Sequence, residues 1–334
     1  MFSQTISRVG FACKPIVESL PQITSTTIKW LSSQPKSTAA ARLESLMQQN
    51  VHTLVKHIQW LGTLPPHLRM YRISSDLCTA YTHPDWMWFY FESNTISWLE
   101  KHLAYAGALA RELDVRLSFH PGQFCVLASD NPEVVERSIM EFEYHADIAR
   151  YMGFGREFQD FKCNVHVGGR QGPDGIKRAV KQLSSVARNI LCIENAEFSW
   201  GLDASLELVD TCALTLDVHH HWIATGEYIL PQDSRVQQLW SSWRGVRPVV
   251  HYSQSREEVI ADCWDAEVLV DLTQVMALGH TRARLRAHSE YYWNQAQNRL
   301  MQQFLPYADI MCEAKQKNLA AHTFANSVLT LEVI

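Results

Sequence analysis

Long apolar runs are missing from this sequence of 334 residues. No stretch approaches the ~20 consecutive apolar residues that a membrane-spanning helix needs. Residues 1–15 also lack the charged start, apolar core and cleavage site of a secretory signal. We therefore expect a soluble protein of the cytoplasm, with no membrane partner.

Paired cysteines and an excess of basic residues are missing as well. None of the eight cysteines forms a Cys-x-x-Cys pair, and several lie in apolar runs, so reduced and buried thiols are expected. Thirty Lys and Arg against 35 Asp and Glu give a net charge of −5. Bulk positive charge therefore does not attract nucleic acid, although a local basic groove remains compatible with this balance.

Histidine, in contrast, is abundant. The chain has 15 histidines, roughly double the share of an ordinary protein. Because neutral imidazole is a common metal ligand, metal binding is the first explanation to test.

The hydrophobic pattern alternates between short apolar runs and longer segments of helical periodicity, with no linker, repeat or low-complexity segment. Eight such units in one chain predict a (β/α)₈ TIM barrel, and a doubly wound open sheet is the main alternative. The predicted strands are 8–13, 70–73, 115–119, 163–167, 190–193, 214–216, 248–251 and 309–312. The predicted helices are 38–60, 95–113, 132–151, 175–187, 204–211, 234–240 and 289–304, and a further one begins near 315.

The domain organisation follows from this pattern. We expect one domain over residues 1–334, with its core over residues 8–325. The segment after the seventh strand is too long for a simple helical crossover, so residues 253–288 are interpreted as an insertion between strands seven and eight.

Metal-ligand residue types follow six successive predicted strands. In a closed barrel the carboxyl ends of the strands meet at one rim, where barrel enzymes have their active sites. One such residue alone is more often a solvated loop residue, but six in succession predict a metal site. Imidazole and carboxylate without thiolate suit Zn²⁺, Mn²⁺ or Fe²⁺, and this many ligands imply two or more ions, as in phosphodiester chemistry. The six residues are His120, His166, Glu194, Asp217, His251 and Glu313.

Other histidines are weaker candidates on spacing alone. At most two of His219, His220 and His221 can face one site. His83 has only its position after the second strand in its favour, and His288 lies far along the predicted insertion.

Eight motifs follow one another along the chain, namely RVGFACK (8–14), YRISSDL (71–77), HPGQF (120–124), NVHVGG (164–169), IEN (193–195), DVHH (217–220), HYS (251–253) and EAKQK (313–317). Together they resemble the UV damage endonuclease family of the xylose-isomerase-like TIM barrel superfamily. The likeness runs in order from residue 8 to about residue 320, whereas endonuclease IV and sugar isomerases share only parts of it. The family is described as a TIM-type barrel with a metal cluster, often manganese, that nicks DNA on the 5′ side of ultraviolet photoproducts.

The resemblance implies a ligand set for two or three divalent ions. Manganese is the metal expected, with Zn²⁺, Mg²⁺ or Fe²⁺ as alternatives. Glu194 would be the bridging carboxylate, and Lys315 would hold a phosphate or a ligand carboxylate. The implied ligands are His83, His120, His166, Glu194, Asp217, His220, His251, His288 and Glu313.

The resemblance also implies residues that contact damaged double-stranded DNA. The family probes the lesion with an aromatic residue after the first strand and a Gln-Tyr pair after the HPG turn, which correspond to Phe11, Gln123 and Phe124 here. Phenylalanine lacks the phenol hydroxyl but keeps the surface for wedging and stacking. Candidate phosphate contacts are Lys14, Arg170, Arg256 and the basic run 280–288, although such a run is as often a solvated face.

One departure from the family bears on activity. Family members usually have a lysine two residues before the strand-seven histidine, and this lysine is modified to a metal-binding carbamate. Val249 stands there in this sequence and cannot coordinate a metal. Water or a carboxylate could replace the ligand, one ion could bind weakly, or the protein could have another reaction.

The sequence therefore predicts a metal-dependent DNA repair endonuclease, with no obligate protein partner. One alternative is a metal-dependent barrel enzyme that acts on a small molecule, such as an isomerase or an oxygenase. The other is a catalytically silent binder of damaged DNA. Metal content and lesion-dependent nicking would separate the three.

Overall fold

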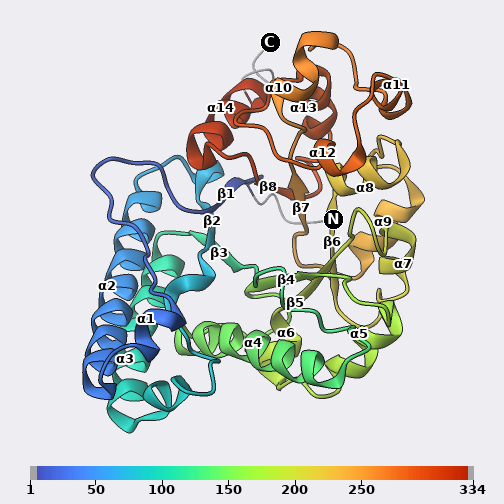
Figure 1. Cartoon of the computed structure of the whole chain (residues 1–334). Coiled ribbons are helices and arrows are strands. Elements are labelled where there is room, and N and C mark those ends of the chain that lie inside the picture. The colour runs from blue at the N-terminus through green and yellow to red at the C-terminus, as the bar shows by residue number, and fades with distance from the viewer. Residues whose placement is uncertain (1–5, 330–334) are drawn as a thin grey trace.

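Eight parallel strands form a closed barrel in the computed structural model, which describes residues 6–329 (Figure 1). The strands pair in the order of the chain, and β8 pairs with β1, which excludes the open sheet. The strands are β1 (Val9–Cys13), β2 (Met70–Ile73), β3 (Arg116–Phe119), β4 (Lys162–His166), β5 (Leu191–Glu194), β6 (Ala213–Asp217), β7 (Val249–Tyr252) and β8 (Asp309–Cys312).

The predicted strands agree with the structure to within one residue at each end, and the TIM barrel is confirmed. Strands in such a barrel are covered on the outside by helices and filled on the inside by side chains, so they read as short continuous apolar runs. This is why the apolar runs located them.

The helices surround the barrel (Figure 1). The single helix predicted over 175–187 is instead two, because Ser184 caps a new helix by accepting a hydrogen bond from the backbone N–H of Ala187 at 3.1 Å. The helices are α1 (Ile28–Ser32), α2 (Lys36–Gly62), α3 (Ser93–Glu112), α4 (Pro132–Tyr151), α5 (Gly172–Val180), α6 (Ser185–Ile190), α7 (Leu202–Leu206), α8 (Val218–Thr225), α9 (Ser234–Ser241), α10 (Glu257–Ile260), α11 (Leu272–Ala277), α12 (Arg282–Leu285), α13 (Gln295–Gln302) and α14 (Lys317–Leu329).

Apolar side chains form one layer of the barrel interior. Met70, Cys192, Val249 and Met311 are buried there in one cluster. Gly10 of β1 faces the same layer, and a Cβ atom at this position would lie 2.6 Å from Cγ of Met70. This filled layer closes the barrel beneath the carboxyl ends of the strands.

The segment between β7 and β8 includes α10, α11 and α12 ahead of α13. Buried side chains of this segment, such as Val275 and Leu285, pack with Trp222 and Ile223 of α8. The segment therefore supports α8 at the rim. Its interpretation as an insertion over 253–288, and the domain range 1–334, which extends beyond the described residues, stay predictions.

All eight cysteines lie within the described residues and are free thiols, most of them buried. Among the described helices, none combines the length and the apolar character that a membrane crossing requires.

Candidate metal centre

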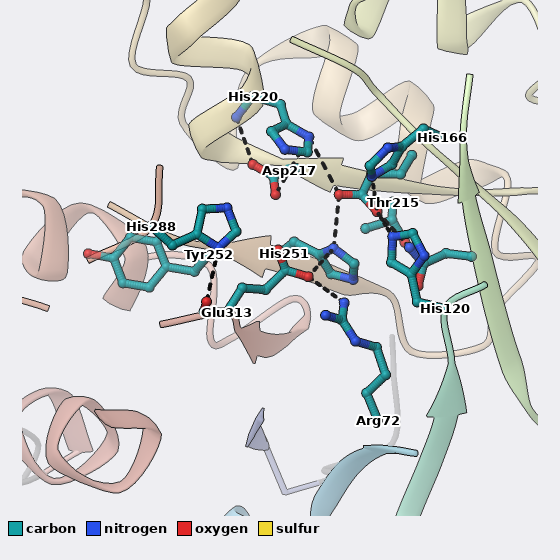
Figure 2. A network of polar contacts seen from close by, with 12 residues as sticks. Arg72, His120, His166, Thr215, Asp217, His220, His251, Tyr252, His288 and Glu313 are labelled. Atoms are coloured by element: carbon teal, nitrogen blue, oxygen red, sulfur yellow. Dashed lines mark hydrogen bonds and ion pairs between the residues drawn. The ribbon is translucent and has the colours of Figure 1, made fainter. Parts of the chain in front are cut away.

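Glu194, the last residue of β5, is fully buried and faces four imidazoles. Nε2 of His120 and Nε2 of His166 lie 3.4 and 3.6 Å from its Oε2 atom. Nδ1 of His251 and Nδ1 of His220 lie 3.0 and 3.6 Å from its Oε1 atom. Figure 2 shows these four histidines gathered around one point from β3, β4, β7 and α8. One carboxylate thus has two potential metal-binding neighbours on each oxygen.

Two groups of residues in the described chain could each hold a metal ion. His120, His166 and Glu194 form one group, and Glu194, Asp217 and His251 form the other. Within each group the ligand atoms all lie within 4.8 Å of one another. Because Glu194 belongs to both groups, two ions here would share its carboxylate.

The orientation of two histidines is fixed from behind by backbone carbonyls. Nδ1 of His120 lies 2.8 Å from the carbonyl oxygen of Pro121, and Nδ1 of His220 lies 3.0 Å from that of Asn195. A carbonyl only accepts, so each Nδ1 carries a proton, and Nε2 is the nitrogen of each ring that can bind a metal when it is unprotonated. This arrangement is typical of histidines that bind metals through Nε2.

Asp217 ends β6 and caps α8, a helix that the sequence analysis did not predict. Its Oδ1 atom accepts a hydrogen bond from the backbone N–H of His220 at 2.7 Å. Its Oδ2 atom is buried and has no hydrogen-bond partner in the described structure. Burial, together with the nearby charges of Glu194 and Glu313, raises the pKa of Asp217 to about 7. The Oδ2 atom lies 3.7 Å from Nδ1 of His220 but accepts no hydrogen bond, and a buried carboxylate oxygen without a donor fits a site for a divalent cation.

Glu313, which follows β8, pairs with a residue that the sequence analysis did not assign. Nη1 of Arg72 in β2 donates to Oε1 of Glu313, and this oxygen lies 3.3 Å from Nδ1 of His251 (Figure 2). Burial opposes ionisation of Glu313, but Arg72 and His251 outweigh burial and lower its pKa. The sequence signal that could have identified Arg72 is a charged residue within the otherwise apolar run of the predicted strand 70–73.

The charges of the centre are strongly coupled. Burial would lower the pKa of His220, but Asp217 and Glu194 outweigh it and raise this pKa to about 9. For His251 burial dominates and lowers the pKa to about 4. Without a metal, a protonated His220 therefore balances part of the carboxylate charge.

Lys162 of β4 lies buried beneath Glu194, and the sequence analysis also missed it. Its Nζ atom lies 2.9 Å from Oδ1 of Asn164 and 2.8 Å from Nε2 of His251. Burial lowers the pKa of Lys162 to about 8. Val249, which stands where the resemblance implies a lysine, lies in the apolar layer of the barrel interior.

Five predicted residues of the metal centre belong to neither group. His220 and Glu313 contact members of the groups, Glu194 and His251 respectively. The other three are His83, His288 and Lys315. His83 is half-buried, and Asp85 is its charged neighbour, at 4.0 Å. His288 is closer, because its Nδ1 atom lies 3.0 Å from the carbonyl oxygen of Glu313. Nζ of Lys315 lies 3.4 Å from Glu290 and is partly exposed.

The residues predicted to contact a lesion occupy different environments. Phe11 is 1% exposed and packs with Tyr71 and Trp60, so the structure does not bring it to the rim. Gln123 and Phe124 lie on the exposed loop after β3, and the side chain of Phe124 is 85% exposed.

A cavity of about 200 Å³ opens beside this loop. Its lining includes Gln123, Glu197 and Phe198 together with His120 and His166 of the metal centre. The metal centre is therefore accessible from the rim.

The predicted phosphate contacts all lie at the surface. Lys14 is exposed. Arg170 and Arg256 are accessible and have acidic neighbours, Asp130 at 3.3 Å and Glu258 at 3.6 Å. Within the run 280–288, Arg282, Arg284 and Arg286 are exposed.

Comparison with known proteins decides the family. The model of the family "UV-endonuclease UvdE" matches residues 7–333. The chain belongs to this family. A UV-damage endonuclease of Schizosaccharomyces pombe is 27% identical to this family member over 94% of this chain and 49% of its own length. A UV DNA damage endonuclease of Bacillus cereus is 26% identical over 89% of this chain and 86% of its own length.

The chain thus spans about half of the yeast relative and most of the bacterial one. Among solved structures, SacUVDE has a TM-score of 0.71 and 23% identity, and the match covers 98% of this chain and 100% of that chain. This likeness confirms the fold of the UvdE family member. The resemblance identified from the motifs is confirmed by the family match.

Proposed function

We propose that this UvdE family member is a metal-dependent endonuclease that hydrolyses the phosphodiester on the 5′ side of ultraviolet photoproducts and other distorting lesions in double-stranded DNA. The observation that carries the proposal is the buried Glu194 carboxylate, shared between two groups of metal-ligand residues. Clustered divalent ions are a common device for phosphodiester hydrolysis, because they provide Lewis acidity at both oxygens of the reacting phosphate.

The proposed cofactor is two or three divalent ions, with Mn²⁺ expected and Zn²⁺, Mg²⁺ or Fe²⁺ as alternatives. Glu194 would bridge, and the Oδ2 atom of Asp217, which accepts no hydrogen bond, fits a cation. His83 and His288 stay predicted ligands from the resemblance, and Lys315 stays a predicted partner of phosphate. The residues around Glu194 that would hold the ions are His120, His166, Asp217, His220, His251 and Glu313.

Damaged DNA would bind across the open rim. The exposed ring of Phe124 would stack on or wedge between bases, and Gln123 beside it, which lines the rim cavity, would offer a hydrogen bond. Phe11 is packed in the core, which argues against direct contact with a base. Lys14, Arg170 and Arg256 are proposed to contact phosphates, which position the duplex without reading its sequence.

The decisive experiment is nicking of irradiated and untreated plasmid with Mn²⁺. We expect the wild-type chain to nick irradiated plasmid preferentially. Glu194→Gln should abolish nicking, because it removes the shared charge while keeping the size of the side chain. Glu44→Gln, the same change on the exposed face of α2, is the matched control and should retain activity.

The other outcomes identify the alternatives. Binding of irradiated DNA without nicking would support the silent binder. Equal nicking of both plasmids would contradict lesion recognition. If the metal-loaded protein neither binds nor nicks irradiated DNA, the remaining alternative is an enzyme that acts on a small molecule.

A further inference from the structure

Lys162 is a buried charged residue in the interior of the barrel, with a relative exposure of 2%. Side chains alternate along a strand, so Lys162 and Asn164 face the same side of β4 as the predicted ligand His166. None of the ion pairs among the described side chains includes Lys162, so its Nζ atom has no carboxylate partner within 4.0 Å there. A buried ammonium without a carboxylate partner is costly, so its position requires a reason.

Lys162 closes a ring of hydrogen bonds around Glu194. Nζ donates to Oδ1 of Asn164 at 2.9 Å, and Nδ2 of Asn164 donates to Oε2 of Glu194 at 2.5 Å. On the other side Nζ lies 2.8 Å from Nε2 of His251, whose Nδ1 lies 3.0 Å from Oε1 of Glu194. Both oxygens of the shared carboxylate are therefore connected to one lysine nitrogen.

The chemistry of the amine fixes the direction of this ring. Because the amine always offers N–H donors, Asn164 must present its oxygen to Lys162 and its NH₂ group to Glu194. Nε2 of His251 contacts Nζ of Lys162, so only Nδ1 of the ring is left to face Glu194. This holds whether Nζ or Nε2 carries the proton between them. Without this lysine, the amide of Asn164 and the ring of His251 could both flip.

We propose that Lys162 is a positioning residue of the metal centre, which orients His251 directly and Glu194 through Asn164. The amine beside the strand-seven imidazole thus comes from β4, while Val249 of β7 lies in the apolar layer with Cys192 and Met311. This role rests on the proposed metal centre but not on the reaction that the centre performs.

The test is metal binding by Lys162→Met, which keeps the length of the side chain but has no nitrogen. Lys181→Met, at the exposed end of α5, is the matched control. Mn²⁺ affinity is measured by titration calorimetry, Mn²⁺ content by atomic absorption, and the coordination of Co²⁺-substituted protein by its visible spectrum. We expect Lys162→Met to bind Mn²⁺ about 10 to 100-fold more weakly, as is usual when support behind a ligand is lost, and to change the Co²⁺ spectrum. Lys181→Met should match the wild type in all three.

A second variant tests the route through Asn164 and covers the case in which Lys162→Met does not fold. Asn164→Leu removes the link to Glu194 but keeps Lys162, and it should weaken Mn²⁺ binding as well. If both single variants fold, their effects should be less than additive in the double variant, because the residues act in one chain of contacts.

Wild-type affinity and an unchanged Co²⁺ spectrum in Lys162→Met, or in Asn164→Leu if only that variant folds, would overturn the positioning role. This failure is distinct from failure of the proposed function. A wild-type chain that binds Mn²⁺ but does not nick irradiated DNA would contradict the proposed endonuclease function. The positioning role of Lys162 could still be tested by comparing Mn²⁺ affinities. A wild-type chain that binds no Mn²⁺ or Co²⁺ would overturn both.

Discussion

Nδ1 of His251 lies 3.0 Å from Oε1 of Glu194, although the two residues are 57 positions apart in the chain. They come from β7 and β5, which are separated by β6 in the barrel. Their contact therefore depends on the curvature of the closed sheet. The unfolded chain has no such site, so metal binding and folding should be coupled.

The first prediction follows from this coupling. Adding Mn²⁺ to metal-free protein should raise the melting temperature, because an ion that binds only the folded state stabilises it. At 100 times its dissociation constant, one ion contributes about 2.7 kcal/mol, or roughly 5 °C. Differential scanning fluorimetry with Mn²⁺ and then EDTA measures the effect. Glu194→Gln should show little of it, and an equal shift in this variant would contradict a metal centre at Glu194.

The second prediction concerns Asp217. Asp217→Asn should keep the cap of α8, since an asparagine oxygen can accept from the N–H of His220 as Oδ1 does now. It also removes a buried negative charge whose pKa is raised to about 7 by burial, so metal-free protein should unfold at the same or higher urea concentration while Mn²⁺ affinity falls about tenfold or more. Asp217→Ala is the comparison, because it should also lose about 1 kcal/mol of helix capping. Normal Mn²⁺ affinity in Asp217→Asn would exclude Asp217 as a ligand.

The third prediction is a pH dependence of metal binding. The pKa of His220 is raised to about 9, so below that pH the imidazole is mainly protonated and must lose its proton to bind a metal. Mn²⁺ affinity should therefore rise with pH between 7.5 and 9, by up to about tenfold per unit for one released proton. Calorimetry in buffers of different ionisation enthalpy counts the protons. His220→Asn should release about one proton fewer, and an unchanged count would remove His220 from the ligand set.

The strand ends and six of the ligand residues could be predicted from sequence, because buried parallel strands are apolar and a polar residue at their carboxyl end is conspicuous. Arg72 and Lys162 could not be placed in the same way. Arg72 lies within β2 and Lys162 begins β4, so neither stands at the carboxyl end of its strand, and the function of each depends on which side chains the closed barrel brings opposite it. The partner of Arg72 is Glu313, 241 positions away.

Two other differences have local causes. The helix over Val218–Thr225 was missed, because its three consecutive histidines gave no clear helical pattern, although Asp217 and Gly226 are a suitable cap and terminator. Phe11 matches a family position by sequence order, but its ring packs against Trp60 and Tyr71. Sequence order alone does not show on which side of a strand a ring lies.

The fourth prediction concerns the buried charge of Lys162. Burial lowers its pKa from 10.5 to about 8, so between these pH values the unfolded chain binds more protons than the folded protein. Folding stability should therefore rise with pH in this window. Below pH 8 the full free-energy cost of burying the charged ammonium of Lys162 opposes folding. The shift of 2.5 units corresponds to at most about 3 kcal/mol.

Metal-free wild type should accordingly gain up to about 3 kcal/mol relative to Lys162→Met between pH 7 and pH 10.5. The difference between the two proteins is the useful quantity, because tyrosines and cysteines titrate in both. Urea unfolding at several pH values measures it. If the free energy of unfolding changes with pH in the same way in wild type and in Lys162→Met, burial does not lower the pKa of Lys162.

The last prediction concerns the exposed ring of Phe124. Phe124→Ala should change the free energy of unfolding by less than about 0.5 kcal/mol, because the side chain is 85% exposed. Nicking of irradiated plasmid at limiting protein should nevertheless fall, since stacking on one base contributes about 1 to 3 kcal/mol. Phe124→Tyr should retain activity, because it keeps the ring and adds only a hydroxyl.

Phe11→Ala provides the contrast that interprets this result. Phe11 is buried against Trp60 and Tyr71, so its truncation should cost about 3 to 5 kcal/mol of stability. At a temperature where this variant is still folded, its nicking should be close to that of the wild type. Loss of nicking in stable, folded Phe11→Ala, together with full activity in Phe124→Ala, would reverse the assignment and place the lesion contact at the first strand.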